Sequence, residues 1–298
     1  MGGMWLRHLT HLELPFLLPS EMSLMVQALV ESPLVSLHMR GWDVTRYTAG
    51  HPGAPHFLEY DLPRLDQLTT LRLTNVRLTT THCLTLALLV PRYNHLGLTS
   101  NRMGDAGVLA LARPSYTRRT LKTLTLVNQG FGDVGASALA TALVHTPRLR
   151  TLDLGRNDIK ISGIMALSGL LPHLPRLATW RLCNNPLGAK GLVFLLRAWT
   201  YAVPRSLWTP AVVAFRDVST APSLGADWPD IVLNDIQLPP SIMALLAATL
   251  PLRPRIQLRC PIRQAAPLAS LVAAAGPSLS NVDIDFNKDA MFKAEAKR

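Results

Sequence analysis

The sequence predicts an α/β fold, a solenoid of short strand–helix units with a parallel sheet on the concave face and helices on the convex face. The first observation is a leucine pattern that recurs every 28 residues through the middle of the chain. The second is a glycine four residues after each copy, followed by an apolar segment of helical length. The third is the composition, because 48% hydrophobic and 16% charged residues provide for a large core. One continuous stack of units is expected, and not two domains.

The repeat unit follows the pattern LxxLxLxxNxL. It is clearest in residues 93–103, 121–131, 149–159 and 177–187. Weaker copies begin at Leu9, Leu34, Leu68, Trp228, Ile256 and Leu279, and a degenerate copy is expected around residues 207–215. About eleven units therefore cover nearly the whole chain. The sequence predicts a single solenoid over residues 1–287, with an insertion loop at 45–67, a degenerate repeat at 203–227 and a C-terminal tail or cap at 288–298.

Each unit begins with a strand and continues into a helix. In the unit at 121–131, the alternation predicts that Leu124 and Leu126 point inward while Thr125 and Val127 point outward. The segment that follows, residues 135–144, carries apolar residues at helical spacing, with Leu139 and Leu143 four residues apart. One strand and one helix cannot bury their apolar faces alone, so successive units must stack on each other.

An asparagine stands where the chain leaves the strand in several units. Its buried side-chain amide can satisfy backbone groups of adjacent turns, which an apolar side chain cannot. We interpret these residues as a structural ladder and not as an active site: Asn101, Asn157, Asn185 and Asn287. Val76, Gln129 and Ile236 occupy the same position in other units, where we expect the ladder to be broken.

These units resemble the leucine-rich repeat family, and their 28-residue length is similar to that of its ribonuclease-inhibitor subclass. The resemblance implies a horseshoe-shaped scaffold for protein interactions, without catalysis. An inhibitor that grips a basic nuclease should carry an acidic concave face. This chain carries a formal net charge of +11, so the inhibitor function is not carried over.

The positive charge is concentrated in the middle of the chain. Residues 60–228 hold 19 basic and 8 acidic residues, with no glutamate, whereas residues 1–59 hold 3 basic and 5 acidic residues. A basic excess of this kind indicates an acidic partner and says little about the fold.

Arginines recur at one phase of the repeat, just before successive units, and others are predicted to point outward from the strands. The first group is Arg64, Arg92, Arg118, Arg119, Arg148, Arg176 and Arg205, and the second is Arg72, Arg156 and Arg181. Cations at helix C-termini stabilise the helix dipole, which accounts for part of the first group. Because the first group shares one repeat phase, we expect it to stack into a stripe along the edge where each helix returns to a strand. The helix dipole does not account for the second group or for the lack of balancing acids, so we predict that these arginines bind phosphate or carboxylate groups.

Motifs for chemistry are missing from the sequence. It contains no dinucleotide-binding glycine motif, no phosphate-binding loop, no HExxH and no GxSxG. Cys83, Cys183 and Cys260 lie far apart, which fits a reducing compartment and excludes a disulfide framework. Asp283 and Asp285 share one face of the last unit and are interpreted as a solvated edge. We predict a chain that is not an enzyme and binds no cofactor, metal ion or small-molecule substrate.

Two kinds of partner remain open. The first is an RNA-rich complex, such as a mitochondrial ribosome, in which the chain is a structural or assembly subunit that also contacts protein subunits. The second is a protein-only assembly, cytoskeletal or ciliary, with an acidic partner. No run of 18 apolar residues occurs, so a membrane span is not expected. The compartment is predicted to be intracellular and reducing, with mitochondrial and cytosolic locations both open.

Overall fold

The structure is a computed structural model of the 298-residue chain. It describes these residues: 8–14, 25, 29–30, 32–41, 57–113, 120–188, 190–191, 194–195, 230–234, 256–259 and 282–284. The predictions for 203–227 and 288–298, and those for Asn287, Arg118, Arg119 and Arg205, lie outside the described residues.

All the described strands belong to one parallel sheet, in which they follow each other in chain order. The strands are β1 (His11–Leu14), β2 (Ser36–Arg40), β3 (Thr70–Thr74), β4 (His95–Thr99), β5 (Thr123–Val127), β6 (Thr151–Asp153), β7 (Thr179–Arg181), β8 (Asp230–Asn234), β9 (Ile256–Arg259) and β10 (Val282–Ile284). Equivalent leucines pair across neighbours, for example Leu96 with Leu124 and Leu124 with Leu152. The parallel solenoid is confirmed, while the count of about eleven repeats stays a prediction.

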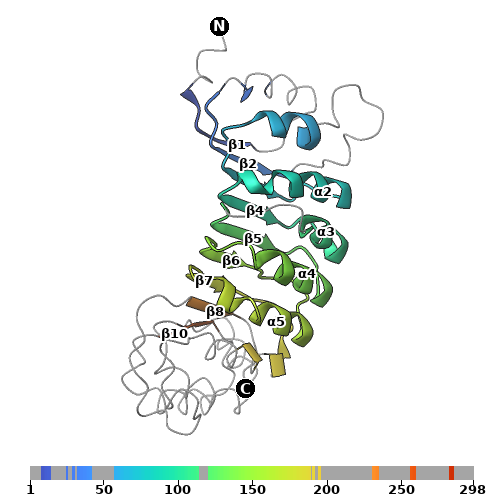
Figure 1. The fold of residues 1–298 in the computed structure, drawn as a ribbon, viewed down its shortest axis with the longest axis vertical. Helices are drawn as coiled ribbons and strands as arrows, with labels where there is room; N and C mark the ends of the chain where they lie inside the picture. Colours follow the sequence, from blue (N-terminus) through green and yellow to red (C-terminus); the bar gives the residue numbers. More distant parts are fainter. Residues whose placement is uncertain are drawn as a thin grey trace, which may run out of the picture.

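Helices cover one face of the sheet, as Figure 1 shows. They are α2 (Thr80–Leu89), α3 (Gly104–Leu111), α4 (Asp133–Leu143) and α5 (Ile161–Ser168), and short helical turns lie at η3 (Phe57–Asp61), η4 (Leu62–Arg64), η5 (Val90–Arg92) and η6 (Leu171–His173). Adjacent parallel strands lie about 4.8 Å apart, whereas packed helices need about 8–10 Å. A stack of such units therefore curves with the sheet on the inside. No helix among the described residues is long and apolar enough to cross a membrane.

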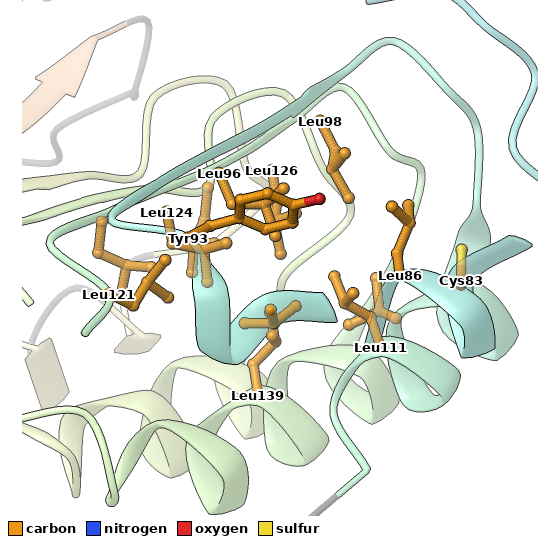
Figure 2. Packing of buried hydrophobic residues seen from close by; sticks show 14 of the residues in the cluster. Cys83, Leu86, Tyr93, Leu96, Leu98, Leu111, Leu121, Leu124, Leu126 and Leu139 are labelled. Atoms are coloured by element: carbon orange, nitrogen blue, oxygen red, sulfur yellow. The ribbon is translucent and has the colours of Figure 1, made fainter. Parts of the chain in front are cut away.

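The core lies between the sheet and the helices. Leu124 and Leu126 are buried, while Thr123, Thr125 and Val127 are only partly buried, which confirms the predicted alternation. Figure 2 shows the Tyr93 ring close to Leu96, Leu124 and Leu126, above the helix that carries Leu139. Since Tyr93 stands at the first position of its unit, where the other clear units have leucine, it fills the same core layer.

Aspartates join the beginnings of successive helices. Asp105, in the first turn of α3, accepts hydrogen bonds through Oδ1 from the backbone N–H groups of Gly132 and Gly135, at 2.9 and 2.7 Å. Asp133 of α4 accepts one from the N–H of Lys160, at 2.8 Å. These carboxylates satisfy N–H groups that a helix start leaves unpaired, and they also favour the positive end of the helix dipole.

This arrangement explains two of the glycines that stand four residues after a unit, Gly135 and Gly163. A Cβ atom at Gly135 would lie 2.9 Å from Asp105 Oδ1, and one at Gly163 would lie 2.6 Å from Asp133 Oδ1. Both distances are shorter than carbon and oxygen tolerate, so a side chain would push the capping aspartate away. At these two positions glycine makes room for the preceding unit.

The asparagine ladder is present, and each residue bridges neighbouring units. Asn101 Oδ1 accepts from Val76 N–H at 2.8 Å, and its Nδ2 donates to Leu73 O at 2.9 Å. Asn185 repeats the arrangement with Ile159 N–H and Leu154 O. The expectation that the ladder is broken at Gln129 is correct for the acceptor of the side chain and wrong for its donor. Gln129 Nε2 still donates to Leu98 O and Val127 O, and only the acceptor half is missing, because its buried Oε1 has no partner among the described residues.

Helix α2 begins with a capping box that contains a histidine. The backbone N–H of His82 donates to Thr79 Oγ1 at 3.3 Å, and the backbone N–H of Thr79 donates to His82 Nδ1 at 3.1 Å. Burial lowers the pKa of His82, and the nearby Glu59 charge opposes this effect only in part. The neutral ring is therefore required, because a proton on Nδ1 would displace the Thr79 N–H.

We expect the stability of the protein to fall as the pH is lowered through about 6.5, the usual histidine value. The pKa of His82 is lower in the folded chain, so the unfolded chain binds the proton more readily and acid favours unfolding. The replacement His82→Gln keeps an acceptor for Thr79 N–H without titrating, and should flatten the dependence of the melting temperature between pH 7.5 and pH 5.5. The exposed His173→Gln is the control and should keep the wild-type dependence. Equal slopes for the two variants would contradict this role of His82.

Candidate functional site

Four of the predicted stripe arginines lie on one edge of the solenoid, where each helix returns to a strand. Arg64 ends η4 and Arg92 ends η5, while Arg148 and Arg176 lie in the turns before β6 and β7. The common repeat phase thus places them at equivalent positions of successive units.

Two of these arginines are engaged within the protein. Arg64 Nη1 lies 3.9 Å from Asp61 Oδ1. Arg92 Nη1 donates to the carbonyl oxygen of Pro63 at 2.7 Å, a contact between successive units. A cation that binds a terminal carbonyl in this way stabilises the end of the preceding helical turn. Arg92 thus has a structural contact within the protein.

Arg148 and Arg176 are accompanied by two cations that are not part of the stripe predicted from the sequence. Lys122 and Arg150 directly precede β5 and β6, and the backbone N–H of Arg150 donates to Lys122 O at 2.8 Å. The two therefore stand at equivalent positions of adjacent units, beside Arg148. The side chains of Arg148, Arg150 and Arg176 are exposed, and that of Lys122 is partly exposed. We call Lys122, Arg148, Arg150 and Arg176 the basic edge. In the part of the chain that the structure describes, none of their charged groups has an ion pair.

A signal for Lys122 and Arg150 does exist in the sequence. Both occupy the second position of LxxLxL, in Leu121-Lys-Thr-Leu124 and Leu149-Arg-Thr-Leu152. The Pro-Arg dipeptides mark only the preceding turn, so a prediction based on them does not include this position.

The three arginines predicted to point outward from strands have different positions. Arg72 is exposed on β3, as predicted. Arg181 is exposed on β7, and its Nη1 lies 3.6 Å from Asp153 Oδ2 on β6, so its charge is partly compensated. The prediction for Arg156 is wrong, because β6 ends at Asp153 and Arg156 lies in the turn beyond it, with φ 58°. Asn128 and Asn184 take the same left-handed conformation at this position of their units. Arg156 therefore belongs to the edge opposite the basic edge.

The open face of the sheet is lined by short polar side chains. The pairing registers place Thr70, His95, Thr123, Thr151 and Thr179 in one row across β3 to β7. They place Arg72, Gly97, Thr125, Asp153 and Arg181 in the next row. No Phe, Tyr or Trp stands at an outward position of the described strands β1 to β7. The face thus offers hydroxyl groups, isolated charges and the imidazole rings of His38 and His95, but none of the larger aromatic rings on which bases stack most often.

His95 is the titratable group of this face with a shifted pKa. Its Nδ1 lies 3.0 Å from Thr123 Oγ1. Burial, Lys122 and Arg72, in that order, lower the pKa of His95. His95 is therefore uncharged at neutral pH, beside two cations.

The described residues contain no cluster of metal-ligating side chains. No group of three or more His, Cys, Asp or Glu side chains among them could hold a metal ion. Burial raises the pKa of the Cys83 thiol to about 12, so this cysteine is not a thiolate. Asp283 lies on β10 opposite Gln257, and Asp285 lies outside the described residues.

The match to a family model agrees with the fold. A family model described as "Leucine Rich repeat" matches residues 94–112 and 147–168. No curated protein matches this chain. The chain is similar to the solved structure titled "Leiomodin-1 Actin-Binding Site 2 (ABS2)", with 16% identity and a TM-score of 0.29 over 65% of this chain and 78% of that one.

The sheet of consecutive parallel strands, the helices on one face and the matched repeats define a class of protein, the α/β solenoid. Leucine-rich repeats are therefore present in this chain. Its fold is that of a protein-interaction scaffold.

Proposed function

We propose that this protein is a non-catalytic scaffold subunit of an RNA-rich complex, a mitochondrial-ribosome-like ribonucleoprotein, and that it docks through the basic edge. The main observation in support of this proposal is a row of cations that have no ion pair among the described residues. The row consists of Lys122, Arg148, Arg150 and Arg176. Since parallel strands lie about 4.8 Å apart, the stack presents cations at regular short intervals. Such a row can neutralise several phosphates of an RNA backbone.

The expected contact is with the RNA backbone and not with the bases. Arginine presents a planar fork of donors that suits phosphate oxygens, whereas base recognition in single strands needs stacking side chains. The open face of β1 to β7 has no Phe, Tyr or Trp at its outward positions. Binding through the basic edge should therefore be independent of sequence and sensitive to salt.

The alternative is a protein-only assembly, cytoskeletal or ciliary, in which an acidic protein surface occupies the basic edge. The family match supports this alternative, because leucine-rich repeats serve as protein-interaction scaffolds. Both proposals use the same cations, so the partner must be distinguished by its chemistry.

Changing Lys122, Arg148, Arg150 and Arg176 to Gln should weaken association with RNA and flatten its salt dependence. For single-stranded RNA, each phosphate that is no longer neutralised by the protein should reduce the slope of log K against log salt by about 0.7. Folding should change little, since exposed cations at helix ends are each worth about 0.3–1 kcal/mol. Fluorescence anisotropy with a labelled oligoribonucleotide, at several salt concentrations, measures the slope.

The matched control removes the same number of positive charges from the opposite edge, through Gln at Arg102, Arg156, Lys160 and Lys190. The control should retain most of the binding and of the salt slope. If both variants lose affinity equally, overall charge drives binding and the basic edge is not the site. Association of the wild-type protein with its cellular complex that survives ribonuclease treatment would favour the acidic protein partner.

A further inference from the structure

Three basic side chains meet where the basic edge turns onto the open face of the sheet. Arg72 points outward from β3 and His95 from β4, while Lys122 directly precedes β5. The register pairs His95 with both Thr70 and Thr123, and the backbone N–H of Lys122 donates to Asn94 O at 2.7 Å. Three successive units thus contribute one basic side chain each to the same corner.

A glycine brings the arginine towards the histidine. Arg72 is paired with Gly97 across β3 and β4, and a Cβ atom at Gly97 would lie 3.3 Å from Arg72 Cγ. The hydrocarbon stem of Arg72 therefore lies close over the backbone of β4, two residues from His95. A larger residue at Gly97 would push the stem away from this strand.

The cluster lacks a compensating acid. Arg72 and Lys122 form no ion pair among the described residues, and they are the charged groups whose fields reach His95. Thr70 and Thr123, the neighbours of His95 in its row, are neutral. His95 itself contributes no charge at neutral pH, because burial and these two cations lower its pKa. Its Nε2 makes no hydrogen bond within the described part of the chain and is left for a ligand.

We propose that Arg72, His95 and Lys122 bind a single oxyanion, a carboxylate or phosphate group on a side chain of a protein partner, and that His95 takes up a proton when the anion binds. The floor beside the cluster consists of Gly97, Thr99, Thr125 and Val127. These short side chains leave room for a polypeptide, and none of them is a Phe, Tyr or Trp ring of the kind that usually stacks a nucleobase. This site goes beyond the RNA-docking proposal and shares only Lys122 with it.

Proton uptake follows from the charges. An anion beside His95 favours the imidazolium and offsets the effect of Arg72 and Lys122, so the pKa of His95 is higher in the complex than in the free protein. The complex then binds more protons than the free protein. By linkage, the affinity for the anion rises as the pH falls.

Sulfate is a suitable probe, because it remains a dianion between pH 5.5 and pH 8 and any pH dependence comes from the protein. We expect saturating sulfate to raise the pKa of His95, measured from the pH dependence of its ring signals by NMR. The ring signals of His82, buried in the capping box of α2, should not respond. Sulfate should bind more tightly at pH 5.5 than at pH 8.

The variants Arg72→Gln and Lys122→Gln should each lower the affinity for sulfate about threefold to tenfold, which corresponds to one charge-assisted contact at a partly exposed site. His95→Asn keeps an amide that can bond to Thr123 and should remove the pH dependence. If sulfate binds without raising the pKa of His95, or if Arg72→Gln binds sulfate as the wild type does, the proposal is wrong. The triple variant Arg148→Gln, Arg150→Gln, Arg176→Gln should still show the sulfate-induced rise in the pKa of His95. This result is expected whether or not the protein binds RNA, so the two proposals can fail independently.

Three ligands distinguish the source of the anion. Short peptides that contain phosphoserine or aspartate should raise the pKa of His95, and the stronger of the two identifies phosphate or carboxylate as the preferred group. A peptide with serine in place of phosphoserine should have no effect. If a single-stranded oligoribonucleotide raises the pKa at lower concentration than either peptide, the occupant is RNA and the assignment to a protein partner is overturned.

Discussion

Replacing Leu152 by Ala is expected to lower the free energy of unfolding by about 2–5 kcal/mol, the usual cost of truncating a core leucine. Leu152 is 1% exposed and lies between its equivalents Leu124 of β5 and Trp180 of β7. A cavity there would weaken the packing with both neighbouring units, and neither unit can close the gap without moving its own strand. Leu154, also fully buried, should behave in the same way.

The matched control is Thr151→Ala, at the outward position next to Leu152. Thr151 is only partly buried and no core residue packs on its outer side, so the change should cost within about 0.5 kcal/mol. Urea unfolding followed by circular dichroism measures both values. Equal losses at Leu152 and Thr151 would mean that the assigned inward and outward positions are incorrect.

The second large effect is expected at Asn157. Its Oδ1 accepts from the N–H groups of Gln129 and Gly130, and its Nδ2 lies within hydrogen-bonding distance of Leu126 O, Leu154 O and Gly155 O. Replacement by Ala leaves buried backbone groups of two units without partners, at about 1–3 kcal/mol each. We therefore expect Asn157→Ala to lower the free energy of unfolding by about 3 kcal/mol or more.

Two further variants serve as comparisons for Asn157→Ala. Gln129→Ala should cost less, because Gln129 supplies donors to Leu98 O and Val127 O but its side chain accepts no hydrogen bond within the described residues. Asn94→Ala removes the same side chain from a partly exposed site and should cost within about 0.5 kcal/mol. If Asn94→Ala and Asn157→Ala have the same cost, the ladder does not stabilise the stack.

Much of the site follows from the repeat phase, and the predictions that fail do so for clear reasons. The described stripe arginines lie on one edge, because residues at one phase of a solenoid must stack. The prediction for Arg156 fails because this position of the repeat lies in the left-handed turn after the strand, as Asn128 does after β5. The break predicted at Gln129 is incomplete because its longer side chain reaches Leu98 O, a carbonyl of the preceding unit.

The alternation of strand and helix, the inward leucines and the order of units can all be read from the amino-acid sequence, because they depend on periods along one stretch of chain. Which cations remain available for a partner depends instead on tertiary contacts. Arg92 donates a hydrogen bond to the carbonyl oxygen of Pro63, and Arg181 forms an ion pair with Asp153. In both cases the partner lies about one repeat earlier in the sequence. Such contacts depend on which side chains of neighbouring units lie next to each other in the folded protein. The local periodicity places a residue on a face or an edge, but it does not determine which neighbour that residue binds.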